Sequence, residues 1–324
     1  MTNSCGHEWV VSITQQEEES DLDRTLLSAI IELPAIKKFA LYINKYSGSD
    51  GSLVLVNQDS LLERLDSQEL TTILNKVAKN KVCISSASSH YTSYIPAYYL
   101  GEVIGVLLVE SEHKLPERSC MLAVHVLNVY ANQLALIHRS RLDPLTELLN
   151  RQTFDKKVIE IISGDTFITS SGASAKLSYW FLALLDIDHF KHVNDNFGHV
   201  IGDEVILLVA RLLKDSFRID DIIFRYGGEE FAVLFQASDE HEALNILDRV
   251  RCNVAEYPFP QINNLTISAG FLALSEVDMV SALVHKADLA LYHSKNNGRN
   301  QVTAYNELEI EQESDVVDDG IELF

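Results

Sequence analysis

Two short stretches carry the residue types best suited to chemistry, and each adjoins an apolar segment. The apolar run FLALL leads into Asp186 and Asp188, which alternation along a strand places on the same side. The stretch RYGGEEF holds Gly227 and Gly228 between apolar segments, where positive φ angles would form a tight hairpin turn before Glu229. If the strand neighbours this hairpin, Asp186 and a glutamate converge. Paired carboxylates with backbone oxygens suit Mg²⁺, which proteins commonly hold together with substrate phosphates.

A third stretch, HVNDNFGHVIGDEV, contains Asn194, His199 and Asp203. Asparagine and aspartate side chains present acceptors and donors that can read the edge of a purine. A helix that starts near Gly202 also offers backbone N–H groups to an anion. Each stretch alone has an ordinary explanation, because GGEE occurs in plain hairpins and an aspartate often ends a strand. The glycine-lysine pattern of a P-loop is missing, which disfavours P-loop NTPase chemistry.

Composition limits the partners. The chain has 324 residues, which favours two domains, and a net charge of -21 from 47 acidic and 26 basic side chains. This balance repels nucleic acids and anionic lipid surfaces, so an anionic small-molecule substrate would need cations gathered in one pocket. The four cysteines are scattered without a C-x-x-C pair, as expected for buried thiols. No apolar run suggests a membrane span and no signal peptide is recognisable, which predicts a cytoplasmic protein without membrane insertion.

The C-terminal half alternates predicted strands and helices, which indicates one layered α/β sheet. We expect strands at 179–186, 222–226, 230–236, 265–272 and 301–305, and long helices at 201–217, 239–256 and 279–296. Residues 306–324 carry eight acidic residues and no Lys or Arg, which predicts a disordered tail.

The N-terminal half reads as an α+β domain behind a flexible lead-in of residues 1–19. Periodicity predicts helices at 22–31 and 61–77, and strands at 39–43, 52–56, 94–100 and 102–110, with a turn at 47–51. A long helix from Pro116 to about Ile137 is the candidate rod between the domains. Its apolar residues either pair across a dimer or pack within their own domain; they are Leu122, Val126, Val129 and Leu136.

The segment YIPAYYLGEVIGVLLVES and the later VLNVYANQLALI resemble the closing half of a GAF domain. The resemblance covers residues 20–139 and implies a sensor for a small molecule or a partner that the sequence does not specify. An unrelated α+β dimerisation domain is the alternative.

Residues 140–305 resemble the GGDEF family of diguanylate cyclases, in the variant whose signature reads GGEEF. The agreement covers five separate stretches: DPLTELLNR, DIDHFK, Asn194 to Asp203, RYGGEEF and ALYHSKNNGRN. The resemblance implies a central, mostly antiparallel sheet flanked by helices, like that of nucleotide cyclases. It also implies a nucleotidyltransferase that condenses two GTP into cyclic di-GMP with release of pyrophosphate. Because each 3′-hydroxyl attacks the other GTP, the enzyme is expected to work as a homodimer.

The resemblance assigns roles residue by residue. Asp186, the carbonyl of Ile187 and Glu229 would bind Mg²⁺, for which Mn²⁺ can substitute, and Glu230 would add a second metal contact or support the turn. Glu229 would also help activate the ribose 3′-hydroxyl. The expected catalytic residues are Glu229, Glu230 and Lys191, and the expected GTP-binding residues are Asn194, His199, Asp203, Gly227, Gly228, Lys295 and Arg299.

A further pattern, R-x-x-D at Arg218 and Asp221, is separated from Gly227 by five residues. With Arg249 it resembles the inhibitory site at which cyclic di-GMP acts as an allosteric inhibitor of the family. As an isolated pattern, it would be an exposed turn with a weak ion pair. Two other functions remain open: an inactive receptor for GTP or cyclic di-GMP, and a cyclase that closes a mononucleotide ring. The intact signature favours the diguanylate cyclase.

Overall fold

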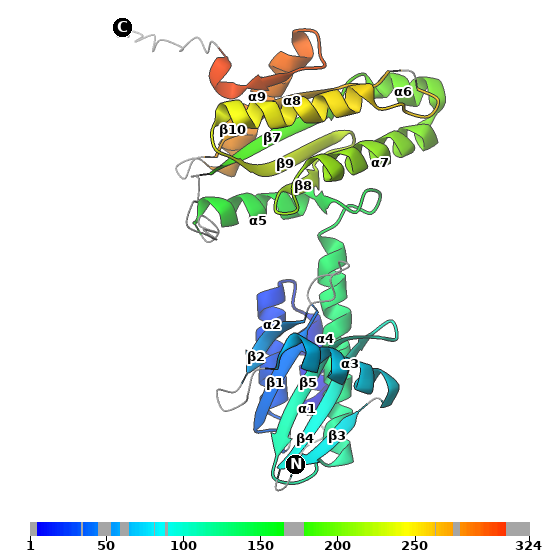
Figure 1. Cartoon of the computed structure of the whole chain (residues 1–324), viewed down its shortest axis with the longest axis vertical. Coiled ribbons are helices and arrows are strands. Elements are labelled where there is room, and N and C mark those ends of the chain that lie inside the picture. Colours follow the sequence, from blue (N-terminus) through cyan, green and yellow to red (C-terminus); the bar gives the residue numbers. More distant parts are fainter. Residues whose placement is uncertain are drawn as a thin grey trace, which may run out of the picture. The chain divides into compact units, whose positions relative to one another are not determined.

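The chain folds into two compact units, residues 1–140 and 141–324. The computed structural model describes residues 5–33, 35–44, 53–58, 65–80, 82–87, 90–164, 178–262, 264–274 and 279–308 (Figure 1). The division after Ser140 falls next to the boundary expected between residues 139 and 140. The expected turn at 47–51, the first turn of the helix expected at 61–77, and the tail beyond residue 308 lie outside the described residues.

The C-terminal unit is built on a six-stranded sheet with the order β11-β10-β7-β9-β8-β6. The three central pairings, β10–β7, β7–β9 and β9–β8, are antiparallel, and the two edge pairings are parallel. The predicted mostly antiparallel sheet is therefore confirmed. Its strands are β6 (Leu149–Asn150), β7 (Tyr179–Ile187), β8 (Ile222–Arg225), β9 (Glu230–Ala237), β10 (Ile267–Ala273) and β11 (Val302–Ala304).

Helices cover both faces of this sheet (Figure 1). Strand β7 is apolar on both sides: Phe181 and Leu185 pack with α7 and α8, whereas Leu182 and Leu184 pack with α5 and α9. This burial on both faces explains why β7 reads as one continuous apolar run. The helices are α5 (Arg151–Ile162), α6 (Phe190–Phe197), α7 (His199–Ser216), α8 (Glu240–Glu256) and α9 (Val280–Asn296).

Three of these elements were absent from the sequence prediction: α5, α6 and β6. Helix α5 has a local signal that was missed, because the Asn150 side chain caps it by accepting a hydrogen bond from the Thr153 N–H. Helix α6 has eight residues and starts after His189, which has a positive φ of 57°. A helix this short shows too few turns for periodicity to reveal it.

The N-terminal unit contains a five-stranded sheet with the order β2-β1-β5-β4-β3, in which all pairings are antiparallel. Helices α1, α2 and α4 contribute to the core on one face, and α3 packs on the other. The predicted α+β class is confirmed, whereas strand β3 was missed. The elements are α1 (Cys5–Thr14), α2 (Glu19–Ile31), β1 (Lys38–Ile43), β2 (Val54–Gln58), α3 (Ser67–Asn80), β3 (Cys83–Ala87), β4 (His90–Tyr99), β5 (Glu102–Ser111) and α4 (Glu117–Ser140).

The flexible lead-in expected for residues 1–19 is wrong for α1. This helix packs against α4, and its Ile13 side chain is fully buried. Trp9 also contacts the core, and its ring N–H donates to the Glu32 carboxylate at 2.7 Å. The spacing of Trp9 and Ile13, four residues apart, is typical of one face of a helix. The acidic residues that follow favoured the prediction of a flexible segment instead.

Helix α4 uses most of its apolar residues within its own unit. Val126 is buried, Leu122 and Val129 pack against the same core, and only Leu136 of the four expected residues is strongly exposed. By length and composition α4 is the one helix of the described chain that could cross a membrane, although 44% of its apolar window is buried. The expected absence of membrane insertion stays a prediction, because a core helix can have the same length and composition. Burial of one face makes it a core helix.

The first residues of the tail expected at 306–324 are ordered, contrary to the prediction. Residues Tyr305–Glu307 form a short 3-10 helix, and the Asn306 side chain donates to Glu240 at 2.8 Å. Described order therefore continues to residue 308.

Candidate active site

A cavity of about 240 Å³ lies where β7 ends, and we call it the charged cavity. Three carboxylates and three cationic side chains line it. Its complete lining is Asp186, Ile187, Asp188, His189, Phe190, Lys191, His192, Glu229, Lys295 and Arg299. Six residues that the sequence assigned to catalysis, metal or phosphate therefore meet in one place, although they come from β7, α6, the glycine turn and the end of α9.

Asp186 is the most perturbed acid of this cavity. Only 6% of the residue is exposed, and its Oδ2 lies 2.8 Å from the Lys295 ammonium group. Burial raises the pKa of Asp186 to about 6, and the charges of Glu229 and Glu230 act in the same direction against the opposing effect of Lys295. Lys295 therefore compensates the negative charge of this buried carboxylate only in part.

Glu229 lies in the turn between β8 and β9. The Arg225 side chain holds this turn by hydrogen bonds to its backbone. The guanidinium donates to the Gly228 carbonyl from Nε at 3.2 Å and from Nη2 at 2.8 Å. The Gly227 N–H and the Tyr226 N–H both donate to the Glu230 carbonyl, at 3.1 and 2.8 Å. These bonds hold the backbone that presents Glu229 to Asp186.

The two glycines of this turn have different surroundings from those expected. Neither Gly227 nor Gly228 has a positive φ, so the expected left-handed hairpin turn is wrong. A Cβ on Gly227 would instead collide with the carboxylate of Glu230, which folds back over it. Space for this side chain, and not backbone conformation, explains the glycine at 227. At Gly228 a Cβ would meet open space.

Arg225 is itself anchored by Asp143 at the entrance of the unit. Its Nη1 lies 3.1 Å from both oxygens of Asp143, and both side chains are mostly buried. Burial would raise the pKa of Asp143, but hydrogen bonds from the Thr146 N–H and hydroxyl, together with Arg225, lower it below its usual value. Asp143 therefore stays ionised, and the chain Asp143–Arg225–Gly228 connects the first residues of the unit to the turn.

Asp188 is a functional candidate that the sequence did not separate from Asp186. Both carboxylates line the charged cavity, as strand alternation predicts. Asp188, however, is 4% exposed and accepts hydrogen bonds from the hydroxyls of Thr266 and Ser268, each at 2.7 Å, and from the Asn300 N–H at 3.0 Å. Its lone pairs are therefore largely committed to the protein.

The last of these bonds holds the turn that carries Arg299. Gly298, Arg299 and Asn300 have φ angles of 114°, 63° and 46°, a run that is costly for the two residues with side chains. Asp188 accepts a hydrogen bond from the N–H of Asn300, the last residue of this run, and Arg299 lines the charged cavity together with Asp188. We therefore describe Asp188 as a positioning residue for Arg299.

The residues expected to recognise guanine lie on α6 and α7, beside the charged cavity but outside its lining. Asn194 is half-buried, whereas His199 and Asp203 are exposed. A Cβ on Gly202 would collide with the Asn194 side-chain oxygen, so the glycine allows Asn194 to approach the start of α7 next to Asp203. Asn194 and Asp203 are thereby brought to one helix junction.

Glu230 separates from Glu229, as strand alternation indicates. It lies opposite Asp186 in the β7–β9 register but lines a neighbouring hollow of about 380 Å³ with Arg151 and Tyr226. The Arg151 guanidinium stacks 4.6 Å from the centre of the Tyr226 ring. Glu230 thus influences Asp186 through its charge, and the support of the turn is the role that its contacts favour.

The R-x-x-D pattern forms a compact turn between α7 and β8. The Asp221 carboxylate accepts from the Arg218 N–H at 2.8 Å and from the Gln236 N–H at 3.4 Å. The Arg249 side chain donates to the Ser216 carbonyl at 3.2 Å, which brings it close to Arg218 in space. Both arginines are exposed, so two cations and one carboxylate share this surface.

The donor set of the charged cavity fits a hard cation. Asp186, Glu229 and the backbone at Ile187 provide oxygens, the donors that Mg²⁺ prefers. No three His, Cys, Asp or Glu side chains of the described residues form a closed metal cage. Mg²⁺ typically uses one or two carboxylates and completes its shell with water and substrate phosphates, so an open site is what its chemistry requires.

The mixed sheet and its two helix layers define the C-terminal unit as an α/β domain with a cavity at a strand end that carboxylates and cationic side chains line. The family model described as "Diguanylate cyclase, GGDEF domain" matches residues 140–301, which is half of the chain. The chain belongs to the GGDEF family.

Similar proteins include named diguanylate cyclases. The probable diguanylate cyclase DgcT of Escherichia coli is 36% identical over 186 residues, 55% of this chain and 38% of that protein. Diguanylate cyclase A of Treponema denticola is 29% identical over 259 residues, 75% of this chain and 68% of that protein. The solved coiled coil and GGDEF domain of DgcB from Caulobacter crescentus, in complex with c-di-GMP, is 30% identical, with 58% of this chain and 97% of that chain covered and a TM-score of 0.49. This chain spans 38% of the length of DgcT and 39% of the length of a second Escherichia coli relative, diguanylate cyclase DgcM.

Proposed function

We propose that this protein is a diguanylate cyclase that condenses two GTP into cyclic di-GMP and releases two pyrophosphates. The observation that carries the proposal is the meeting of Asp186, Glu229 and three cationic side chains in one cavity of a GGDEF-family domain. The family match and the named relatives favour cyclic di-GMP over a mononucleotide ring.

The charged side chains divide the work of phosphoryl transfer. Asp186, the Ile187 carbonyl and Glu229 would hold Mg²⁺, which acts as a Lewis acid on the phosphate oxygens. Lys191, Lys295 and Arg299 offset the charge of the phosphates and of the departing pyrophosphate. Glu229 accepts the proton of the ribose 3′-hydroxyl, whose oxygen bonds to the α-phosphorus of the other GTP as the bond to pyrophosphate breaks.

Recognition of guanine falls to the junction of α6 and α7. Asn194 and Asp203 offer the donor and acceptor groups that a guanine edge requires, with His199 at the start of α7. One such site holds one GTP, so two C-terminal units must face each other for both bonds to form. We therefore propose a homodimer with apposed half-sites.

The experiment is incubation of the purified full chain with GTP and Mg²⁺, followed by mass analysis of the nucleotides. We expect cyclic di-GMP and pyrophosphate in a ratio of one to two. GTP binding without product would identify a receptor, and guanosine 3′,5′-cyclic monophosphate would identify a mononucleotide cyclase. Either result would overturn the proposal.

We also propose product inhibition at Arg218, Asp221 and Arg249. Two exposed guanidinium groups near one carboxylate suit a dianionic guanine dinucleotide, because guanidinium groups bind phosphates and guanine edges with paired hydrogen bonds. Arg218→Ala should keep the initial rate, bind cyclic di-GMP about tenfold more weakly and continue to consume GTP after the parent protein has stopped. Progress curves measure this, and equal inhibition in both proteins would contradict the assignment.

The N-terminal unit is proposed to regulate this activity as a GAF-like domain in a cytoplasmic protein. Its α+β composition and its single antiparallel sheet support the comparison with a GAF domain. Full-length protein and residues 141–324 should differ in activity at low concentration if this unit controls dimerisation.

A further inference from the structure

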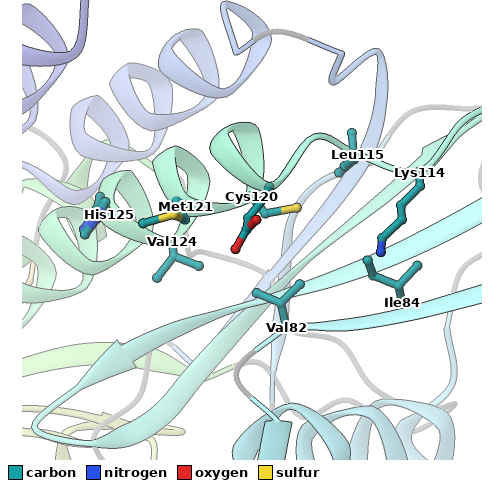
Figure 2. Close-up of a pocket in the computed structure, with 9 residues that line it drawn as sticks. Val82, Ile84, Lys114, Leu115, Cys120, Met121, Val124 and His125 are labelled. Atoms are coloured by element: carbon teal, nitrogen blue, oxygen red, sulfur yellow. The ribbon is translucent and has the colours of Figure 1, made fainter.

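The N-terminal unit contains a large pocket between strand β3 and the first half of helix α4, which we call the α4 pocket. Its volume is about 830 Å³, within the range of small-molecule sites. Figure 2 shows Val82 and Ile84 beneath it, and Cys120, Met121 and Val124 of α4 above them. The remaining lining residues are Lys114, Leu115, Glu117 and His125.

The middle of the α4 pocket is apolar, and its only thiol, Cys120, is mostly protonated near neutral pH. Val82, Ile84 and Val124 are aliphatic, and Met121 adds a flexible thioether that adapts to the shape of a ligand. Burial raises the pKa of the Cys120 thiol, with the Lys114 charge opposing, so the thiol stays neutral near pH 7. The described residues also contain no cluster of three potential metal ligands. These walls favour a non-covalent ligand with a hydrocarbon part.

One end of the α4 pocket carries positive charge. Figure 2 shows the Lys114 side chain extending towards Ile84, at the opposite end from His125. Within the described chain no carboxylate pairs with the Lys114 ammonium group. Helix α4 begins at Glu117, so the positive end of its dipole lies at the same end of the pocket.

A second hollow continues the positive charge beyond Lys114. It measures about 520 Å³, shares Lys114 with the α4 pocket and adds Lys37 and Lys38. Glu110 and Glu112 also line this hollow, so its lysines partly balance local acid. Three lysines and three glutamates line the two hollows, so this region is close to neutral in a chain with a net charge of -21, and Lys114 is the cation that an anionic end group in the α4 pocket would meet.

We propose that the α4 pocket binds an amphipathic carboxylate, with its hydrocarbon chain along Val82, Ile84 and Val124 and its carboxylate at Lys114. A wholly apolar ligand would leave the Lys114 ammonium group without a counter-ion. This inference concerns the N-terminal unit and does not depend on the proposed cyclase activity.

The experiment titrates the full chain with decanoate, decanol and decyltrimethylammonium by calorimetry, below their micelle concentrations. We expect decanoate to bind most tightly. Lys114→Met should weaken decanoate about fivefold, because it removes one partly exposed ion pair, and should leave decanol unchanged. Glu117→Gln should strengthen decanoate, because it removes the carboxylate nearest to Lys114 in sequence within the pocket lining. Lys76→Met, which removes the same charge from the exposed face of helix α3, is the matched control.

The position of the ligand needs an independent readout. Decanoate should slow the alkylation of Cys120 by N-ethylmaleimide, measured by peptide mass spectrometry. Val124→Trp should fill the pocket and abolish both binding and protection, while circular dichroism shows that the fold is retained. Equal affinity for decanol and decanoate, or binding that survives Val124→Trp, would overturn the proposal. So would an absence of decanoate binding together with a dimer that Val124→Trp dissociates, because the groove would then be a contact between copies.

Discussion

The charged cavity of the C-terminal unit and the α4 pocket of the N-terminal unit differ in how their linings are made. The charged cavity has about 240 Å³ and is lined by three carboxylates and three cationic side chains. The α4 pocket has about 830 Å³ and is mostly aliphatic, with Lys114 and Glu117 as its ionic groups. Charge pairing requires particular residues in particular places, whereas apolar walls require only shape and volume. Removal of one charged side chain should therefore affect the function of the charged cavity much more than ligand binding in the α4 pocket.

The largest expected effect comes from removing a metal ligand. Glu229→Ala and, separately, Asp186→Ala should lower the rate of cyclic di-GMP formation at least about a thousandfold, because each removes a carboxylate from the proposed Mg²⁺ site. Neither side chain is part of an apolar core, so circular dichroism should show a folded protein. Glu256→Ala, at the exposed end of α8, should keep full activity. Normal turnover by either folded variant would show that the charged cavity does not depend on single charged side chains.

The anchor of the glycine turn should have the next largest effect. Asp143→Asn and Arg225→Ala should each lower activity about 10- to 100-fold and raise the Mg²⁺ concentration needed for half-maximal rate, because the turn no longer holds Glu229 in place. The double variant should be little worse than Arg225→Ala, since both substitutions break one chain of contacts. The exposed pair Arg211–Asp215 provides the control. Additive losses would mean that the two residues act independently.

Asp188 should act through Arg299. Asp188→Asn and Arg299→Ala should each raise the KM for GTP about tenfold with a smaller change in kcat, because both weaken a phosphate contact. In the double variant the second substitution should add little. Asp215→Asn controls for the loss of one negative charge. A change in kcat alone, or additive effects on KM, would assign Asp188 to another role.

The smallest effect concerns stability and pH. The pKa of Asp186 rises from 3.8 to about 6 on folding, so the folded chain holds an extra proton between these values and loses stability as pH rises through that window. Without metal, Asp186→Asn should therefore stabilise the C-terminal unit by about 3 kcal/mol at pH 8 and by little at pH 4. Hydrogen exchange of the β7 amides measures this difference. An equal gain at both pH values would show that ionisation is not the cause.

The sequence was informative wherever a strand end or turn placed polar residues next to apolar ones. Strand alternation located Asp186 and Asp188 on one side and separated Glu230 from Glu229. It could not show that Asp188 is committed to Thr266 and Ser268, because those partners lie about 80 residues away in the sequence. Contacts between distant segments leave no local pattern.

Contacts between distant segments also explain why the conformation of the glycine turn, helix α1 and the α4 pocket were not predicted correctly. At position 227 the feature that a Cβ would meet is the Glu230 side chain, whereas local turn rules suggested a positive φ. Helix α1 is held by its packing on α4, and the acidic residues after it concealed a short apolar face. Lys114 and Ile84, which line one pocket, lie 30 residues apart and outside every predicted helix and strand, so no spacing rule could have joined them.

The balance of charge in the cavity has a kinetic consequence. Three carboxylates and three cationic side chains cancel formally, while the chain as a whole carries -21. An approaching nucleotide anion therefore feels the repulsion of the whole surface before it reaches the cations that hold it. Salt shortens the reach of that repulsion to about 10 Å at 0.1 M, whereas contacts inside the cavity are screened much less. Nucleotide association should thus become faster as ionic strength rises, the reverse of what electrostatic steering gives in enzymes whose field attracts their substrate.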